Sequence, residues 1–136
     1  MALGDQIGEV SGKITGTRVL VPEGQQVKVE VSIEGSGRIL GEEIADLGTY
    51  WQTVRPGGEL YGEGNNVWLT NDGENVLWQG FGIGYPTGPP PAGHFGVCGS
   101  QQTESQKLAP LNSAATLCEL DVDAEGNYRY TVWEWK

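Results

Sequence analysis

The sequence lacks the features that mark several large classes of protein. No stretch approaches the roughly 18 consecutive apolar residues that a membrane-spanning helix needs, so we expect no membrane partner. Lys and Arg number only 8 against 18 Asp and Glu, which gives a net charge of −10. Such a chain has no basic patch to neutralise phosphates, and its charge would repel DNA and RNA. We therefore expect no nucleic-acid partner.

Cysteine and histidine are also scarce. Cys98, Cys118 and His94 are too few for a metal site with four Cys or His ligands, so we expect no metal. The glycines at 80–84 lack the following helix of a nucleotide-binding loop, and no other cofactor motif occurs, so we expect no cofactor. Residues 1–8 do not have the pattern of a secretory signal, which predicts a cytoplasmic protein with reduced thiols. A Cys98–Cys118 disulfide is the alternative.

Alternation of apolar and polar residues is the main signal that the sequence does contain. It is clear at 27–34, 118–123 and 128–133, and a period of two is typical of strands with one buried face. Only residues 105–111 suggest a short helical turn, while the Pro-rich segment 86–93 predicts a loop. Turn residues then divide the chain into eight strands, near 8–21, 26–35, 38–55, 59–70, 75–85, 94–103, 113–123 and 127–135. The third is long for one strand, which suggests a bulge or bend at Gly41 or Gly48.

Glycine is abundant, with 22 of 136 residues, and many glycines fall inside predicted strands. A strand glycine costs about 0.5–1 kcal/mol relative to alanine, so this number needs a geometric reason. Strong coiling of a small closed sheet is one reason, and aromatic rings lying over the glycines are another. We therefore predict an all-β fold in which residues 1–136 form a single domain, an antiparallel closed β-barrel of about eight strands. A two-sheet sandwich is the alternative.

Aromatic residues are the candidates for a ligand site, because ligand pockets are commonly aromatic. Trp68 and Trp78 flank the turn at 71–73, so they should lie close together on one face of adjacent strands. The 86–93 loop would lie over one end of the barrel as a lid. The alternative is that these rings only fill the core. The proposed ligand-binding residues are Tyr50, Trp68, Trp78, Phe81 and Tyr85.

Two residues are weak candidates for acid–base catalysis. Glu63 stands between two glycines and shares strand parity with Tyr61 and Val67, so it is expected to face inward. A buried carboxylate could act as an acid or a base. The other candidate is His94, the single histidine, beside the Pro-rich loop. The alternatives are a solvated glutamate and an ordinary surface histidine.

Several short blocks carry a resemblance over nearly the whole chain. They are Gly48–Trp51, Arg55–Gly58, Leu60–Gly64, Trp78–Gly80 and Tyr130–Trp135. With these blocks the chain resembles a family of short, uncharacterised prokaryotic proteins, and its layout is similar to the barrels of allene oxide cyclase and dirigent proteins. The resemblance implies an eight-stranded antiparallel barrel with an apolar cavity, often in oligomers. A lipocalin-like barrel is related, but the lipocalin Gly-x-Trp motif is missing. No catalytic motif of these enzymes matches residue by residue.

Three functions fit these observations. The first is binding of a small apolar or aromatic molecule in the barrel, and the second is a cofactor-free isomerase or cyclase. The third is a structural protein whose barrel is filled by its own side chains. A structure with no internal cavity above about 300 Å³ would remove the first two functions and leave the third. Trp133 and Trp135 share one strand face, which suggests a homo-oligomer contact.

Overall fold

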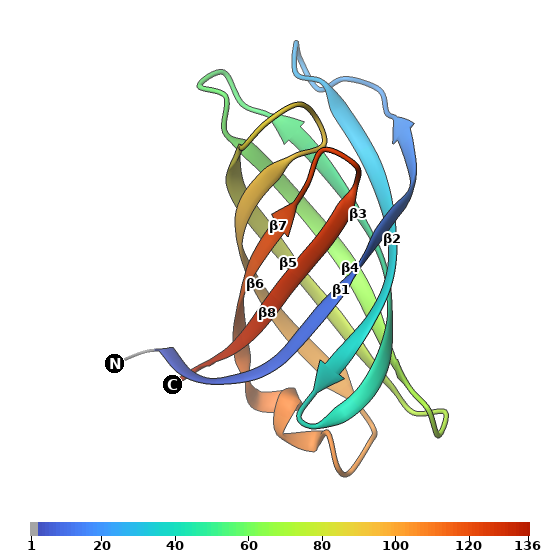
Figure 1. The fold of residues 1–136 in the computed structure, drawn as a ribbon. Coiled ribbons are helices and arrows are strands. Elements are labelled where there is room, and N and C mark those ends of the chain that lie inside the picture. The colour runs from blue at the N-terminus through green and yellow to red at the C-terminus, as the bar shows by residue number, and fades with distance from the viewer. Residues whose placement is uncertain (1–2) are drawn as a thin grey trace.

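The eight strands form one closed antiparallel barrel (Figure 1). The structure is a computed structural model that describes residues 3–136. Each strand pairs with its neighbours in sequence, and β1 pairs with β8 to close the barrel. The prediction of an all-β, eight-stranded closed barrel is confirmed, and the sandwich alternative is wrong. The elements are β1 (Leu3–Val19), β2 (Lys28–Ile39), β3 (Glu42–Val54), β4 (Leu60–Thr70), β5 (Asn75–Pro86), β6 (Gly93–Thr103), the 3-10 helix η1 (Ala109–Ser113), β7 (Ala115–Val122) and β8 (Asn127–Trp135).

Strand alternation decides which side chains fill the interior. On β2, Val31 is buried and its neighbour Glu30 lies on the opposite, outer side, where it pairs with Arg18. On β8, Tyr128, Tyr130 and Val132 are all buried. These are the parities that the sequence pattern predicts. The core therefore lies inside the barrel and is shared by all eight strands.

The predicted strand 38–55 is wrong, because it contains a hairpin turn. β2 runs through the predicted turn at 35–37 and ends at Ile39, and β3 begins at Glu42. Leu40 and Gly41 between them have φ values of 49° and 80°, as a two-residue turn with two positive φ values requires. Gly37 lies within β2 and not in a turn. This strand position requires glycine, because a Cβ there would collide with the Glu9 backbone of β1.

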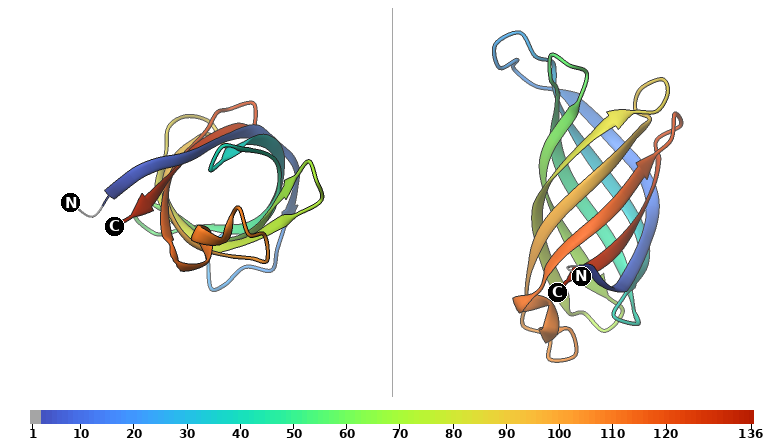
Figure 2. Two further views of the ribbon diagram at one scale, coloured as in Figure 1. Left: turned by 90° about the horizontal axis from the view of Figure 1, so that it is seen from below. Right: turned by 90° about the vertical axis from the view of Figure 1, so that its left-hand side faces the viewer.

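One end of the barrel is covered by the segment between β6 and β7. The lower end in Figure 1 carries residues 104–114, which include η1 and lie below the strands both there and in the right-hand view of Figure 2. Leu108 and Leu111 of this segment are buried in the core. Lys107 fixes the segment through ion pairs of 2.7 Å to Asp72 and 2.8 Å to Glu42. The helical turn predicted at 105–111 therefore exists, but its regular part is η1.

Within residues 3–136, no helix is long and apolar enough to cross a membrane.

Candidate functional site

A pocket of about 90 Å³ lies inside the barrel, in the half nearer the 55–59 and 87–92 connections. Its wall is mostly apolar, and it extends down to a buried polar network. The side chains that surround it include Tyr50, Trp68, Trp78, Phe95, Val97 and Leu120. The volume is well below the roughly 300 Å³ at the lower end for drug-sized ligands. The barrel interior is therefore largely filled by its own side chains.

Inward-facing glycines leave the remaining space. Gly62 and Gly64 of β4 and Gly80 and Gly82 of β5 all line the pocket. The Trp78 ring lies over Gly80 of its own strand and over Gly99 of the neighbouring strand β6, since a Cβ added to either glycine would collide with that ring. This confirms the expectation that aromatic rings lie over strand glycines. The large Trp78 ring occupies the space that Gly80 and Gly99 leave free.

A buried carboxylate lies beside the pocket. Asp46 on β3 has no exposed surface. Its Oδ1 accepts a hydrogen bond from Asn66 Nδ2 at 2.8 Å, and its Oδ2 accepts one from the Tyr128 hydroxyl at 2.8 Å. Burial raises the pKa of Asp46, while the hydrogen bonds from Asn66 and Tyr128 act in the opposite direction. Every buried polar atom in this network is satisfied.

The inward side chains of the pocket wall offer hydrogen-bonding groups without charge, because Glu63, which is among the lining residues, has its side chain on the outer face. Asn66 and Tyr130 connect it to the network, and the Tyr130 hydroxyl accepts a hydrogen bond from Trp68 Nε1 at 3.0 Å. Burial raises the pKa of Tyr50 to about 12 and that of Cys118 to about 12, so both are neutral at pH 7. The wall can therefore orient a polar atom of a ligand, but it presents no ionised nucleophile.

The predicted ligand-binding residues divide between the two sides of the wall. Tyr50, Trp68 and Trp78 line the pocket, and both tryptophans are buried. The side chains of Phe81 and Tyr85 lie on the outer surface, 45% and 58% exposed. The reason is alternation along β5, because Trp78 and the glycines occupy its inward positions. Phe81 is still among the residues that line the pocket, whereas Tyr85 is not. The expectation that both rings face into the cavity is wrong, and a ligand-binding role for them stays a prediction.

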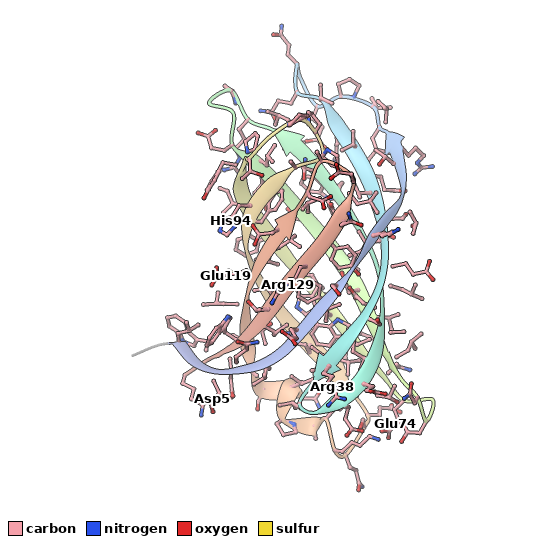
Figure 3. The ribbon with its side chains drawn as sticks, viewed as in Figure 1. Asp5, Arg38, Glu74, His94, Glu119 and Arg129 are labelled. Atoms are coloured by element: carbon pink, nitrogen blue, oxygen red, sulfur yellow. The ribbon has the colours of Figure 1, made fainter. Side chains whose placement is uncertain are left out.

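Both weak catalytic candidates also lie outside. Glu63 is exposed and accepts a hydrogen bond from the Tyr61 hydroxyl at 2.8 Å, so the expectation that it faces inward is wrong. Its parity partners Tyr61 and Val67 are themselves on the outer face. His94 lies on the outer surface (Figure 3), with Nδ1 2.7 Å from Asp121 Oδ1. Asp46 was not predicted as a site residue, although it shares strand parity with the pocket residue Tyr50.

The two thiols are free and point to opposite sides of the sheet. Cys118 is buried and faces inward, and Cys98 is half-buried on the outer face. The register pairs Cys98 with Leu117 and Cys118 with Val97, so the two sulfurs are separated by the sheet itself. This arrangement disfavours the disulfide alternative.

The Pro-rich loop connects β5 to β6 at the upper end, where Ala92 is buried. A lid role for this loop stays a prediction.

The comparisons with known proteins establish the fold alone. No protein-family model matches the sequence, and the search of curated proteins gives no match. Solved structures do match over nearly their whole length. A protein of unknown function from Clostridium acetobutylicum has a TM-score of 0.84 at 14% identity, covering 100% of this chain and 99% of that one. A β-barrel-like protein from Acinetobacter baumannii has a TM-score of 0.82 at 16% identity, with coverage of 98% and 95%.

A more distant match is described as an enzyme from Penicillium herquei. It has a TM-score of 0.73 at 15% identity and covers 100% of this chain and 96% of that one. The resemblance to uncharacterised barrel proteins is thus confirmed for the fold. Because one barrel supports many activities, none of these likenesses carries a function to this chain.

Proposed function

We propose that the barrel binds a compact, mostly apolar molecule of a few heavy atoms with one polar atom. The observation that carries this proposal is the pocket of about 90 Å³, apolar along most of its wall and bordered by Asn66 and Tyr130. An unfilled space of this size costs about 2 kcal/mol at ~24 cal/mol per Å³. The space could be made smaller by a single change, because an alanine at Gly82 would fill part of it.

The pocket volume limits the ligand. A cavity of about 150 Å³ accommodates benzene, so the present pocket takes a smaller guest. Binding would be driven by burial of the apolar body. The Asn66 amide and the Tyr130 hydroxyl would orient the polar atom.

Two probes test this proposal. Xenon requires only apolar space, and isopropanol adds one hydroxyl to a small apolar body. We expect saturable binding of both, observed by xenon NMR shifts and by a change in tryptophan fluorescence, since Trp68 and Trp78 line the pocket. Absence of saturation for both probes would contradict the proposal.

A matched pair of variants locates the binding. Gly82→Ala places a methyl group in the pocket, where its nearest neighbours are Val97 Cγ2 at 3.1 Å, the Gly96 carbonyl oxygen at 3.5 Å and Val97 Cβ at 3.9 Å. We expect it to weaken the binding of both probes several-fold. Gly16→Ala is the control, because a Cβ at Gly16 meets nothing within 4 Å and that residue is exposed on β1. Equal binding by the two variants would place the probes elsewhere.

The structural function is the second candidate. The observation that favours it is the same volume, because about 90 Å³ is below the roughly 300 Å³ under which only the structural function is expected to remain. The binding proposed above is therefore restricted to guests smaller than an ordinary ligand. If the structural function holds, the pocket is a packing defect and neither probe saturates. The isomerase alternative relied on Glu63 or His94. The Glu63 side chain is exposed on the outer face of the pocket wall, and His94 lies on the outer surface beside Asp121, so neither side chain faces the inside of the pocket.

A further inference from the structure

A broad groove crosses the outer surface of the barrel from β2 to β6, with a volume of about 870 Å³. This volume falls within the roughly 300–1,000 Å³ of ordinary ligand sites, whereas the interior pocket of about 90 Å³ does not. One row of paired residues runs across the groove from Trp51 through Glu63 and Phe81 to Cys98, and we call it the Trp51 row. Glu63 and Phe81 are exposed, so this row stands on the outer side of the wall.

Three aromatic rings lie side by side in the groove. The ring centres of Trp51 and Tyr61 are 5.7 Å apart, and those of Tyr61 and Phe81 are 6.4 Å apart. The rings come from the adjacent strands β3, β4 and β5, and Phe81 is 45% exposed. Together they offer a ligand an extended aromatic surface.

A row of uncharged polar side chains runs beside the rings. The register pairs Thr49 with Asn65, Asn65 with Gln79, and Gln79 with Ser100, so this row crosses β3 to β6. Each of the four stands two positions along its strand from a member of the Trp51 row, and side chains two apart share a face. All four are exposed and line the groove. A ligand on the rings can therefore reach several neutral hydrogen-bonding groups.

The charges at the groove disfavour a charged ligand. The exposed Glu63 and the net charge of −10 would repel an anion such as a nucleic acid. A cation would compete with the protein's own cations for the rings. Lys28 Nζ lies 4.4 Å from the ring centre of Trp51, and Arg55 Cζ lies 4.4 Å from that of Tyr61. A neutral ligand meets neither obstacle.

The polar groups require a ligand that both donates and accepts hydrogen bonds. The Glu63 carboxylate can only accept, and the amides of Asn65 and Gln79 each carry one acceptor oxygen and one donor nitrogen. A proline-rich peptide could lie on aromatic rings, but its prolines have no N–H for these acceptors. A pyranose sugar has hydroxyl groups that donate and accept, around a ring whose C–H groups can pack on an aromatic face.

We propose that this groove binds a neutral linear oligosaccharide. Its sugar rings pack on Trp51, Tyr61 and Phe81, and its hydroxyl groups bond to Asn65 and Gln79. Because the aromatic surface extends over three strands, several sugar units bind more tightly than one. The proposal concerns the outer side of the wall and does not depend on binding in the interior pocket.

The experiment titrates the wild-type protein with cellohexaose, maltohexaose, xylohexaose and mannohexaose, and separately with decaproline. Proton–nitrogen NMR spectra follow the side-chain amides of Asn65 and Gln79 and the indole N–H of Trp51, which all belong to the groove. We expect at least one hexasaccharide to shift these signals saturably. Its monosaccharide should bind about tenfold more weakly or worse, because it covers fewer of the rings.

Two matched pairs of variants locate the binding. Phe81→Ala removes a ring, and Ile83→Ala is its control, because Ile83 is 44% exposed on the same strand but does not line the groove. Gln79→Ala removes an amide, and Gln102→Ala is its control, an exposed glutamine on β6 outside the groove lining. We expect Phe81→Ala to weaken binding about tenfold and Gln79→Ala about threefold or more, while both controls bind like the wild type.

Three outcomes would overturn the proposal. One is that no hexasaccharide moves the groove signals at millimolar concentration. Another is saturable binding of decaproline without binding of any saccharide, which would assign the groove to a peptide. The third is that each variant binds no more weakly than its control, which would place the sugar elsewhere on the barrel. Circular dichroism checks that each variant is folded. Gly82→Ala, which fills part of the interior pocket, should leave saccharide binding unchanged, so failure of one site is distinguishable from failure of the other.

Discussion

Trp68 and Tyr130 are joined across the interior of the barrel, where the indole Nε1 donates a 3.0 Å hydrogen bond to the phenol oxygen. The two residues are 62 positions apart and belong to β4 and β8, which are not neighbours in the sheet. Both side chains are buried. The bond therefore crosses the interior and fixes the distance between opposite parts of the wall beside the pocket.

This bond predicts a coupled effect of two substitutions. Trp68→Phe and Tyr130→Phe should each lower the free energy of unfolding by about 1–3 kcal/mol, because each leaves a buried polar partner unsatisfied. The double variant should lose less than the sum, by about 1 kcal/mol, since both polar groups are then gone. Urea unfolding of the four proteins measures this cycle. Strictly additive losses would mean that the hydrogen bond contributes nothing.

The eight strands could be predicted because side chains on a half-buried strand alternate with a period of two. The β2–β3 turn could not, because Leu40 is an unusual residue at a positive φ. Its side chain packs partly against the core, and this tertiary contact outweighs the local preference for Asn or Asp. The glycines at 35 and 37 suggested a turn instead, although they are needed for close contact with β1 and β8.

Which face of β5 points into the barrel could not be predicted from its sequence. Both faces of this strand are uncharged, one with glycines and the other with large apolar residues, so alternation alone does not tell which is inside. Burial of apolar area favours placing Phe81 and Tyr85 inside, and this gave the wrong answer. The interior space is already taken by the Trp78 ring, which lies against Gly80 and Gly99. Only the complete barrel shows that contact.

The burial of Asp46 could not be predicted either, because it also depends on contacts that only the complete barrel makes. A carboxylate in a strand is usually on the wet face, and the partner that stabilises it, Tyr128, is 82 positions away. The register alone brings the two residues together. Its parity with the inward Tyr50 is the one signal in the sequence that pointed to burial.

The raised pKa of Asp46 predicts a stability that falls with rising pH. A raised pKa means that the folded protein holds this proton more tightly than the unfolded chain does. The contribution is fully present below the unfolded value of about 3.9, and it is lost as the pH rises to the higher folded value. Asp46→Asn removes this titration, so its stability relative to wild type should increase across that interval. Urea unfolding at a series of pH values measures the difference, and a constant difference would contradict the raised pKa.

The two cysteines should differ in reactivity. Cys118 is buried with a pKa of about 12, whereas Cys98 is partly exposed on the outer face. Because the thiolate is the reactive form, iodoacetamide at pH 8 should alkylate Cys98 in dilute native protein and leave Cys118 unmodified. In urea both should react. Mass spectrometry of peptides distinguishes the sites, and a two-hydrogen deficit in the unreduced protein would reveal a disulfide instead.

The turn between β2 and β3 can be tested at Gly41, whose φ of 80° is in the left-handed region. Alanine there should lower the free energy of unfolding by about 1–2 kcal/mol, because its Cβ approaches the carbonyl oxygen in this conformation. The cost comes from the local backbone alone, since a Cβ at Gly41 meets no atom of the rest of the protein within 4 Å. Gly16→Ala is the matched control, with the same open surroundings but without a positive φ, and it should change stability by less than about 0.5 kcal/mol. Urea unfolding midpoints of the two variants give the comparison. Equal midpoints would mean that β2 and β3 are not joined by this tight turn, and the register that places Asp46 beside Asn66 and Tyr128 would then have to be shifted.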